Sequence, residues 1–247
     1  MRHGEGTVIN VGPVTSGATL MYSGKGRTSY SIRWWTWSKY SHIGGLVRLT
    51  SKQWKMAAEE GILEHLSLVD KHIERTARWL GSGKWLVFES TSLNRDPCCL
   101  AGWKIKGVQA HPINTVVCTY PGKLDVVPIS RHNWLTEEDS DRLAMSCLSG
   151  LGKPYDTSGA AVAGTFFLKR WLFPTNEIQY CAEYWKQRLA VVDLMDRTSV
   201  VGTTPASAYR RLRRSGVGLK PIRLFENQGH AAFRWQGKVW NFNERQT

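Results

Sequence analysis

Residues 42–49 read HIGGLVRL, an apolar stretch that carries two adjacent glycines. This composition predicts a buried strand, and Gly44 and Gly45 indicate a place where another part of the protein comes close to the backbone. Further along the chain, residues 84–89 (KWLVFE) predict a second short strand that is apolar up to its last residue. Each of these strands carries a polar residue at one end, His42 in the first and Glu89 in the second.

The segments around these two strands alternate between strand and helix signals. Strands are predicted at 18–22, 106–113 and 124–129, and Pro128 in the last suits an edge strand. Helical spacing covers 51–80, with Gly61 as an interruption and GSG at 81–83 as the stop. Further helices are predicted from Thr136 to about 151, from about 178 to about 195, and after Thr204, where Pro205 takes the first helical position. Strands clustered between 18 and 130 with helices on either side predict an α+β fold.

The overall composition is that of a globular protein. The chain has 247 residues, of which 42% are hydrophobic and 21% charged, enough for one large domain or two small ones. It contains no run of about eighteen apolar residues and no apolar signal-peptide region near its start. We therefore expect a protein that is made and kept in the cytoplasm, unless another route exports it.

The cysteine and histidine patterns do not favour a metal or cofactor site. Five cysteines form an odd number without a CxxC pair, so neither a disulfide framework nor a zinc site is expected. His65 and His72 lie seven residues apart and make no HExxH motif, and His111-Pro112 is expected to end a strand. GKGRTS lacks P-loop spacing, and no dinucleotide fingerprint is present. We predict no cofactor.

The chain is strongly basic, with a formal net charge of +13. Such a surface attracts anions, including nucleic acid, acidic lipid and teichoic-acid-like polymers, although sequence-specific nucleic-acid binding is not predicted. One short stretch is either a solvated helix face or an anion-docking patch; it contains Arg210, Arg211, Arg213, Arg214, Lys220 and Arg223. Trp34, Trp35 and Trp37, beside Arg33 and Lys39, could contact a membrane surface.

Three residues carry candidate chemistry. Cys181 lies near the start of a predicted helix, where the dipole and free N–H groups favour a thiolate and can stabilise an oxyanion. His42, on a rigid strand, could serve as the base for that thiol. Glu89 could hold the second ring nitrogen of such a histidine. The alternative for each is structural: a buried small side chain, a satisfied core histidine and a carboxylate that faces water.

The order of the motifs resembles a known family. KYSHIGGLV, VFEST, KGVQAHPI, GKPYD and YCAEYW follow one another as in the circularly permuted NlpC-type papain-like cysteine hydrolases, a group that includes YiiX/YaeF-like bacterial proteins and, more distantly, lecithin:retinol acyltransferases. The resemblance covers roughly 17–215. It implies a permuted papain-like fold, with an antiparallel sheet or small barrel packed against helices.

The resemblance also implies roles and boundaries. Cys181 would be the nucleophile, His42 the general base and then acid, Glu89 the orienting residue, and Tyr155 an aid to oxyanion or substrate binding. Apart from the resemblance, Asp125 and Asp156 could be rival orienting acids, although neither lies on the predicted apolar strand next to His42. The family's Cys-Ser-Glu is Cys-Ala-Glu here. The expected organisation is an arm (1–16), a catalytic domain (17–224) whose helical insertion (51–80) could cap the cleft or dock a partner, and a tail of uncertain fold (225–247).

Three functions follow from this interpretation. The first is a cysteine amidase or peptidase acting on a peptidoglycan-type peptide or another small amide, with an anionic cell-wall polymer as a further partner. The second is a lipid acyltransferase or lipase that uses the same thiol. The third is a non-catalytic binding or virion component that keeps the fold; a phage source, with virion association, would fit the first and the third.

Overall fold

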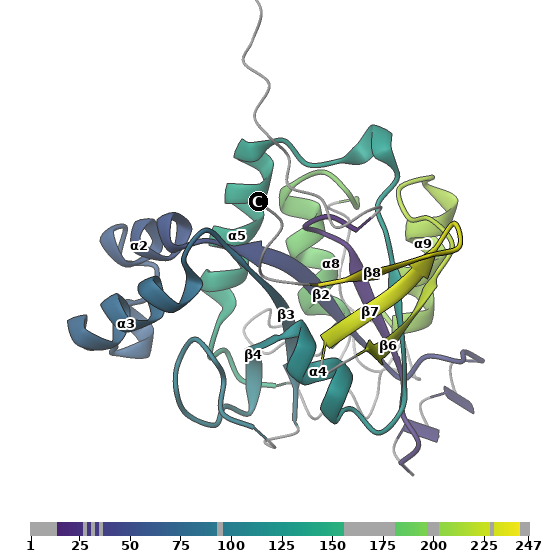
Figure 1. Ribbon diagram of the computed structural model, residues 1–247, viewed down its shortest axis with the longest axis horizontal. Helices are drawn as coiled ribbons and strands as arrows, with labels where there is room; N and C mark the ends of the chain where they lie inside the picture. Colours follow the sequence, from purple (N-terminus) through teal and green to yellow (C-terminus); the bar gives the residue numbers. More distant parts are fainter. Residues whose placement is uncertain are drawn as a thin grey trace, which may run out of the picture.

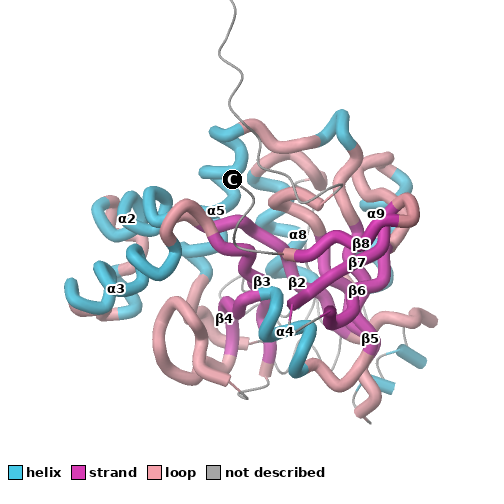
Figure 2. Tube along the Cα trace, viewed as in Figure 1, coloured by secondary structure: helices cyan, strands magenta, loops and turns pink. Residues whose placement is uncertain are grey.

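The computed structural model describes residues 14–26, 29–30, 33–34, 37–92, 96–155, 181–196, 203–227 and 230–242. They form an α+β fold, in which an eight-stranded antiparallel sheet packs against helices (Figures 1 and 2). The strands are β1 (Thr19–Ser23), β2 (His42–Leu49), β3 (Lys84–Thr91), β4 (Gly107–Pro112), β5 (Lys123–Val127), β6 (Ile222–Asn227), β7 (His230–Trp235) and β8 (Lys238–Asn241). The α-helices are α2 (Ser51–Glu59), α3 (Asp70–Leu80), α4 (Ile113–Thr119), α5 (Glu137–Gly150), α8 (Cys181–Val191) and α9 (Pro205–Arg214), with 3₁₀ turns η1 (Glu64–Leu66) and η2 (Arg131–Asn133).

The sheet has the strand order β4-β3-β2-β1-β5-β6-β7-β8. The apolar strand β2 lies between β1 and β3, so it is paired on both edges, as a buried strand should be. The five strands predicted from the sequence are all present. The edge position predicted from Pro128 is wrong, because β5 pairs with both β1 and β6 and ends at Val127, one residue before the proline.

The last part of the chain differs from the prediction. The tail predicted at 225–247 begins inside β6, and β7 and β8 extend the sheet as far as Asn241. Phe233 of β7 and Phe242, the residue after β8, are buried and pack against each other. Phe242 also contacts Trp85 of β3, at 6.1 Å between ring centroids. The sheet therefore curls, so that β8, at one edge of the sheet, approaches β3, the strand next to the other edge.

This curl separates two hydrophobic clusters. One contains residues of β1, β3, β5 and β7 together with Ile113 and Val116 of α4, which packs against β6 and β7. The other lies between the sheet and the helices α2, α3, α5, α8 and α9. Helix α8 is buried along most of its length and contacts β2, β3 and α5, which places it against the centre of the sheet.

The predicted insertion at 51–80 forms α2, η1 and α3, with the break after α2 at the expected glycine and the stop at Gly81. Thr50 and Gln53 make a capping box at the start of α2. The insertion joins the end of β2 to the start of β3. Since β2 is eight residues long, that junction lies roughly 23 Å from His42. The insertion therefore leaves the sheet at the end of β2 far from His42, and Figure 1 shows α2 and α3 at one side of the molecule and α9 at the other. Its role as a cap or a docking surface stays a prediction.

The first described residues also correct the predicted arm at 1–16. Residues 1–13 lie outside the described chain, but Val14, Thr15 and Ser16 are buried. The Ser16 hydroxyl accepts a hydrogen bond from the backbone N–H of Arg48, at 3.0 Å. The chain is therefore already part of the fold by Val14.

Candidate active site

His42 and Glu89 meet across neighbouring strands. The Nε2 atom of His42 lies 2.7 Å from Oε2 of Glu89, and both side chains are largely buried, with 20% and 13% of their surface exposed. The register pairs Gly45 with Phe88, so Glu89 lies opposite Gly44 and reaches His42 diagonally. A side chain at Gly44 would crowd Glu89, with its Cβ 3.3 Å from that of the glutamate. The glycine therefore leaves room for the contact.

Cys181 interacts with the same imidazole. Burial is the largest influence on the pKa of His42 and lowers it, but charge and hydrogen-bond interactions with Cys181, then with Glu89, raise that pKa to about 10. Burial raises the pKa of Glu89, while its hydrogen bond with His42 and the imidazolium charge bring it below the ordinary value. Because Glu89 lies at Nε2, Nδ1 is the ring nitrogen left for an interaction with Cys181. The imidazole therefore lies between a carboxylate and a thiol.

Gly45 explains how α8 reaches the histidine strand. A Cβ at Gly45 would lie 1.9 Å from the Trp185 ring, so only a glycine admits this indole onto β2. The Trp185 Nε1 atom donates a hydrogen bond of 2.8 Å to Oγ1 of Thr19, the β1 residue paired with Gly45. The close approach predicted from the two glycines is confirmed. It positions Cys181, one helical turn before the tryptophan, near His42.

Two further residues of the site were not identified from the sequence. Tyr22 of β1 lies directly opposite His42, and their ring centroids are 4.8 Å apart. His111 of β4 lies near Glu89; burial lowers its pKa and the Glu89 charge opposes this. Both residues lie near the ends of strands that the sequence predicts. Local sequence does not show which strands pair, so it could not show that these strand ends meet at His42.

The remaining candidate acids and Tyr155 have other surroundings. Asp125 binds Tyr40, Lys39 and Arg223 and is the core of a separate cluster. Asp156 lies outside the described residues. Tyr155 is half-buried against the helix-side core and follows Pro154, which bridges to Gly107 at the start of β4. Its role beside the nucleophile stays a prediction.

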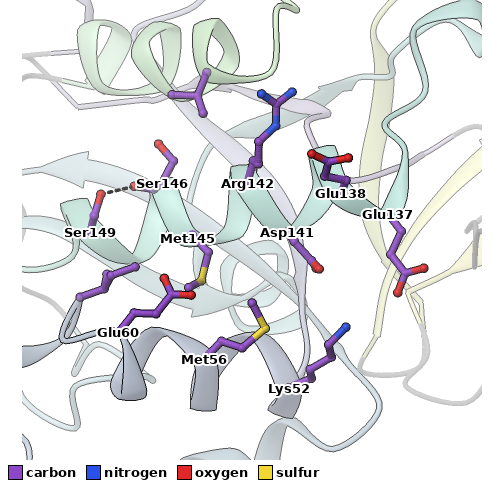
Figure 3. A pocket seen from close by; sticks show the side chains of 12 residues that line it. Lys52, Met56, Glu60, Glu137, Glu138, Asp141, Arg142, Met145, Ser146 and Ser149 are labelled. Atoms are coloured by element: carbon purple, nitrogen blue, oxygen red, sulfur yellow. Dashed lines mark hydrogen bonds between the residues drawn. The ribbon is translucent and has the colours of Figure 1, made fainter.

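A groove of about 970 Å³ lies between α2 and α5 (Figure 3). Met56 and Met145 line its middle, with carboxylates and Lys52 along the rim. It reaches α8 only at Val191, ten residues and therefore about 15 Å from Cys181. The groove is distinct from the cysteine–histidine site.

The predicted contact surfaces are only partly described. Trp34 is 66% exposed and Trp37 is 92% exposed, whereas Trp35 lies outside the described residues. On α9, the side chains of Arg210, Arg211, Arg213 and Arg214 are all exposed. Two of them have internal partners, since Arg211 pairs with Asp196 and Arg213 donates to the carbonyl of Gly218. Anion docking on this face stays a prediction.

The described part of the chain contains neither a candidate metal site nor a candidate membrane-spanning helix. No group of three or more His, Cys, Asp or Glu side chains there could hold a metal ion. None of the described helices combines the length and the apolar character that crossing a bilayer requires.

Similarity to known proteins is found among solved structures. No protein-family model matches the chain, and no curated protein matches it. Among solved structures, a similar chain is the metalloprotein yiiX from Escherichia coli O157:H7, at 19% identity over 83% of this chain and 83% of that chain, with a TM-score of 0.44. The description as a metalloprotein applies to yiiX.

Proposed function

We propose that the protein is a cysteine-dependent amidase or peptidase with Cys181 as nucleophile, His42 as acid and base, and Glu89 as the orienting carboxylate. One observation carries the proposal: His42 contacts Glu89 through Nε2 at 2.7 Å and also interacts with Cys181. An imidazole held between a carboxylate and a thiol is suited to proton transfer in acyl chemistry. The motif order supports the narrower assignment to the permuted papain-like hydrolases.

In the proposed reaction, the Cys181 thiolate attacks the carbonyl carbon of an amide. The protonated His42 gives its proton to the leaving amine as the C–N bond breaks, and a thioester forms on Cys181. Neutral His42 then takes a proton from water, which attacks the thioester. The C–S bond breaks, the carboxylic acid leaves, and the Cys181 thiolate and protonated His42 are regenerated. Glu89 keeps the imidazole in one orientation through both halves of the cycle.

The substrate class in this proposal is a peptidoglycan-type peptide or another small amide, which rests on the motif resemblance. Cys181→Ser should abolish hydrolysis of a peptidoglycan stem peptide and leave the midpoint of thermal unfolding unchanged. Cys118→Ala is the matched control, because Cys118 is exposed and lies on α4. Retained hydrolysis in Cys181→Ser would exclude the mechanism.

Lipid acyl transfer by the same thiol is a second candidate. It is favoured by the exposure of Trp34 and Trp37 close in sequence to His42, together with Lys39, whose side chain is 63% exposed. Mass spectrometry of the protein incubated with phospholipid vesicles would detect an acyl thioester on Cys181. That adduct, without cleavage of the stem peptide, would select this candidate over the amidase.

The non-catalytic alternative makes a different prediction for the thiol. A binding protein that only keeps the fold has no need for an activated cysteine. Iodoacetamide labelling near neutral pH, resolved by peptide mass spectrometry, should be faster at Cys181 than at the exposed Cys118 if the site is catalytic. Equal or slower labelling of Cys181 would favour a binding role.

A further inference from the structure

Tyr22 has a buried hydroxyl inside the proposed site. Only 2% of the residue is exposed, and its ring is held edge-on between His42, at 4.8 Å, and Tyr120, at 5.0 Å between centroids. The hydroxyl makes no hydrogen bond of standard geometry within the described residues. A buried hydroxyl without a partner destabilises a protein, so its presence next to catalytic groups calls for a functional explanation.

The sheet brings this hydroxyl towards Glu89. Tyr22 on β1 and Glu89 on β3 flank β2, two strand spacings or about 9.6 Å apart across the sheet. Tyr22 pairs with His42 and Glu89 lies opposite Gly44, so the two are also offset by two residues, and their backbones are about 12 Å apart on the diagonal. Gly44 has no side chain on this diagonal, and a tyrosine and a glutamate together are long enough to span it. The hydroxyl comes close enough for Glu89 and Tyr22 to interact, although it lies outside standard hydrogen-bond geometry.

We propose that Tyr22 is a positioning residue of this site, whose hydroxyl acts as a second donor to the Glu89 carboxylate in the free protein and matters most when His42 is neutral. The inference rests on the proposed function. In the acyl-enzyme, His42 has given up its proton, and the buried Glu89 charge then faces only a neutral N–H. A second donor keeps Glu89 ionised, and an ionised Glu89 keeps His42 oriented to activate water.

The electrostatics of the surrounding groups agree with this role. Burial, followed by the Glu89 charge, raises the pKa of the Tyr22 hydroxyl, so it remains a proton donor. The interaction with Tyr22 is among those that lower the pKa of Glu89, after His42 and His111. The groups facing this pair are His42 on β2, His111 on β4, Tyr120 after α4, and Cys181 on α8.

The test compares Tyr22→Phe with Tyr120→Phe, which changes the neighbouring ring. The readout is the pH dependence of Cys181 alkylation by iodoacetamide, followed by peptide mass spectrometry. Removing the Tyr22 donor raises the pKa of Glu89, so the acid limb of the profile should move to higher pH by about 0.5 to 1 unit. Tyr120→Phe should leave it unchanged. Thermal unfolding of Tyr22→Phe should occur at an equal or higher midpoint, because an unsatisfied hydroxyl is removed.

A second variant should shift the acid limb of the alkylation profile in the opposite direction. 3,5-Difluorotyrosine at position 22 is a stronger donor and should move the same limb to lower pH. An unshifted profile in both variants, or a lower unfolding midpoint for Tyr22→Phe with an unshifted profile, would overturn the proposal. Alkylation needs no substrate, so these results can be interpreted even if the wild-type protein hydrolyses no amide and the proposed function fails.

Discussion

Two buried carboxylates in the same sheet have opposite surroundings. Asp125 on β5 is bound by Arg223, by Lys39 at 3.4 Å and by the hydroxyl of Tyr40 at 2.8 Å. Glu89 on β3 is bound by His42, a group that can lose its charge. An arginine and a lysine hold Asp125 in one state, whereas a titratable imidazole leaves Glu89 able to take part in proton transfer. The difference separates a structural carboxylate from a candidate catalytic one.

The largest expected effect comes from Glu89→Gln. The amide cannot stabilise an imidazolium, and it can turn its NH₂ towards Nε2 and select the wrong tautomer. Turnover should fall on the order of 10²- to 10⁴-fold while the protein stays folded. Steady-state hydrolysis and thermal unfolding measure the two quantities. Activity within about tenfold of wild type would remove Glu89 from the proposed mechanism.

Gly45→Ala tests whether the site depends on how α8 is seated. The new Cβ would overlap the Trp185 ring, so α8 must shift and carry Cys181 with it. We expect the free energy of unfolding to fall by about 1–3 kcal/mol and Cys181 alkylation to slow. Gly26→Ala is the matched control, because a Cβ there has no neighbour within 4 Å. Equal stability of the two variants would contradict the described packing of the indole.

Asp125→Asn should change stability and leave the chemistry intact. Removing a buried charge from its cations costs about 3–5 kcal/mol when the cations are also buried. Here Lys39 and Arg223 are half-exposed or more and can turn to water, so a loss of about 2 kcal/mol is expected. Denaturant unfolding measures it. Turnover lowered as strongly as in Glu89→Gln would show that the two carboxylates do not have separate roles.

The smallest expected effect is the pH dependence of stability. The lowered pKa of Glu89 contributes stability above its ordinary value of 4.5, and this is lost as pH falls. The raised pKa of His42 contributes stability that is complete below its ordinary value of 6.5 and is lost as pH rises through about 10. Between pH 6.5 and 10, the free energy of unfolding of the wild type should therefore fall by about 1 kcal/mol more than that of His42→Ala.

Asp125 supplies the contrast for that measurement. The pKa of Asp125 is lowered: burial raises it, but the bonds to Arg223 and Tyr40 more than compensate. The stability that Asp125 contributes is also lost in acid. Its hydrogen-bond partner is an arginine, a permanent cation, so the alkaline loss should be absent from the difference between wild type and Asp125→Asn. Unfolding curves at pH 6.5 and 10 test both differences. An alkaline loss of equal size in both would contradict the assignment of that loss to His42.

The sequence was sufficient for features that depend on local pattern. The apolar run at β2, the capping threonines before α5 and α9, and the glycine stop at Gly81 were each predicted and are present. The contact between His42 and Glu89 was also expected, because a carboxylate ending an apolar strand needs a partner. The catalytic roles of these residues remain predictions.

Features that depend on distant pairing could not be predicted. The strands β7 and β8 carry mixed polar and apolar residues, and only pairing with β6 and the contact between Phe242 and Trp85 give them a buried side. Tyr22 could be assigned to a strand, but not to the position opposite His42, since register is a property of the assembled sheet. The direction of β2 likewise determines that the insertion begins at the strand end far from His42.

The bond between Trp185 and Thr19 has a consequence for folding kinetics. It joins residues separated by 166 positions, and α8 can dock only on a strand pair that has already formed. Contacts of such long sequence separation form slowly, because loop closure must come first. We expect the thiol to meet its base only near the end of folding. Under the proposed function, nascent and partly folded chains would then lack hydrolytic activity.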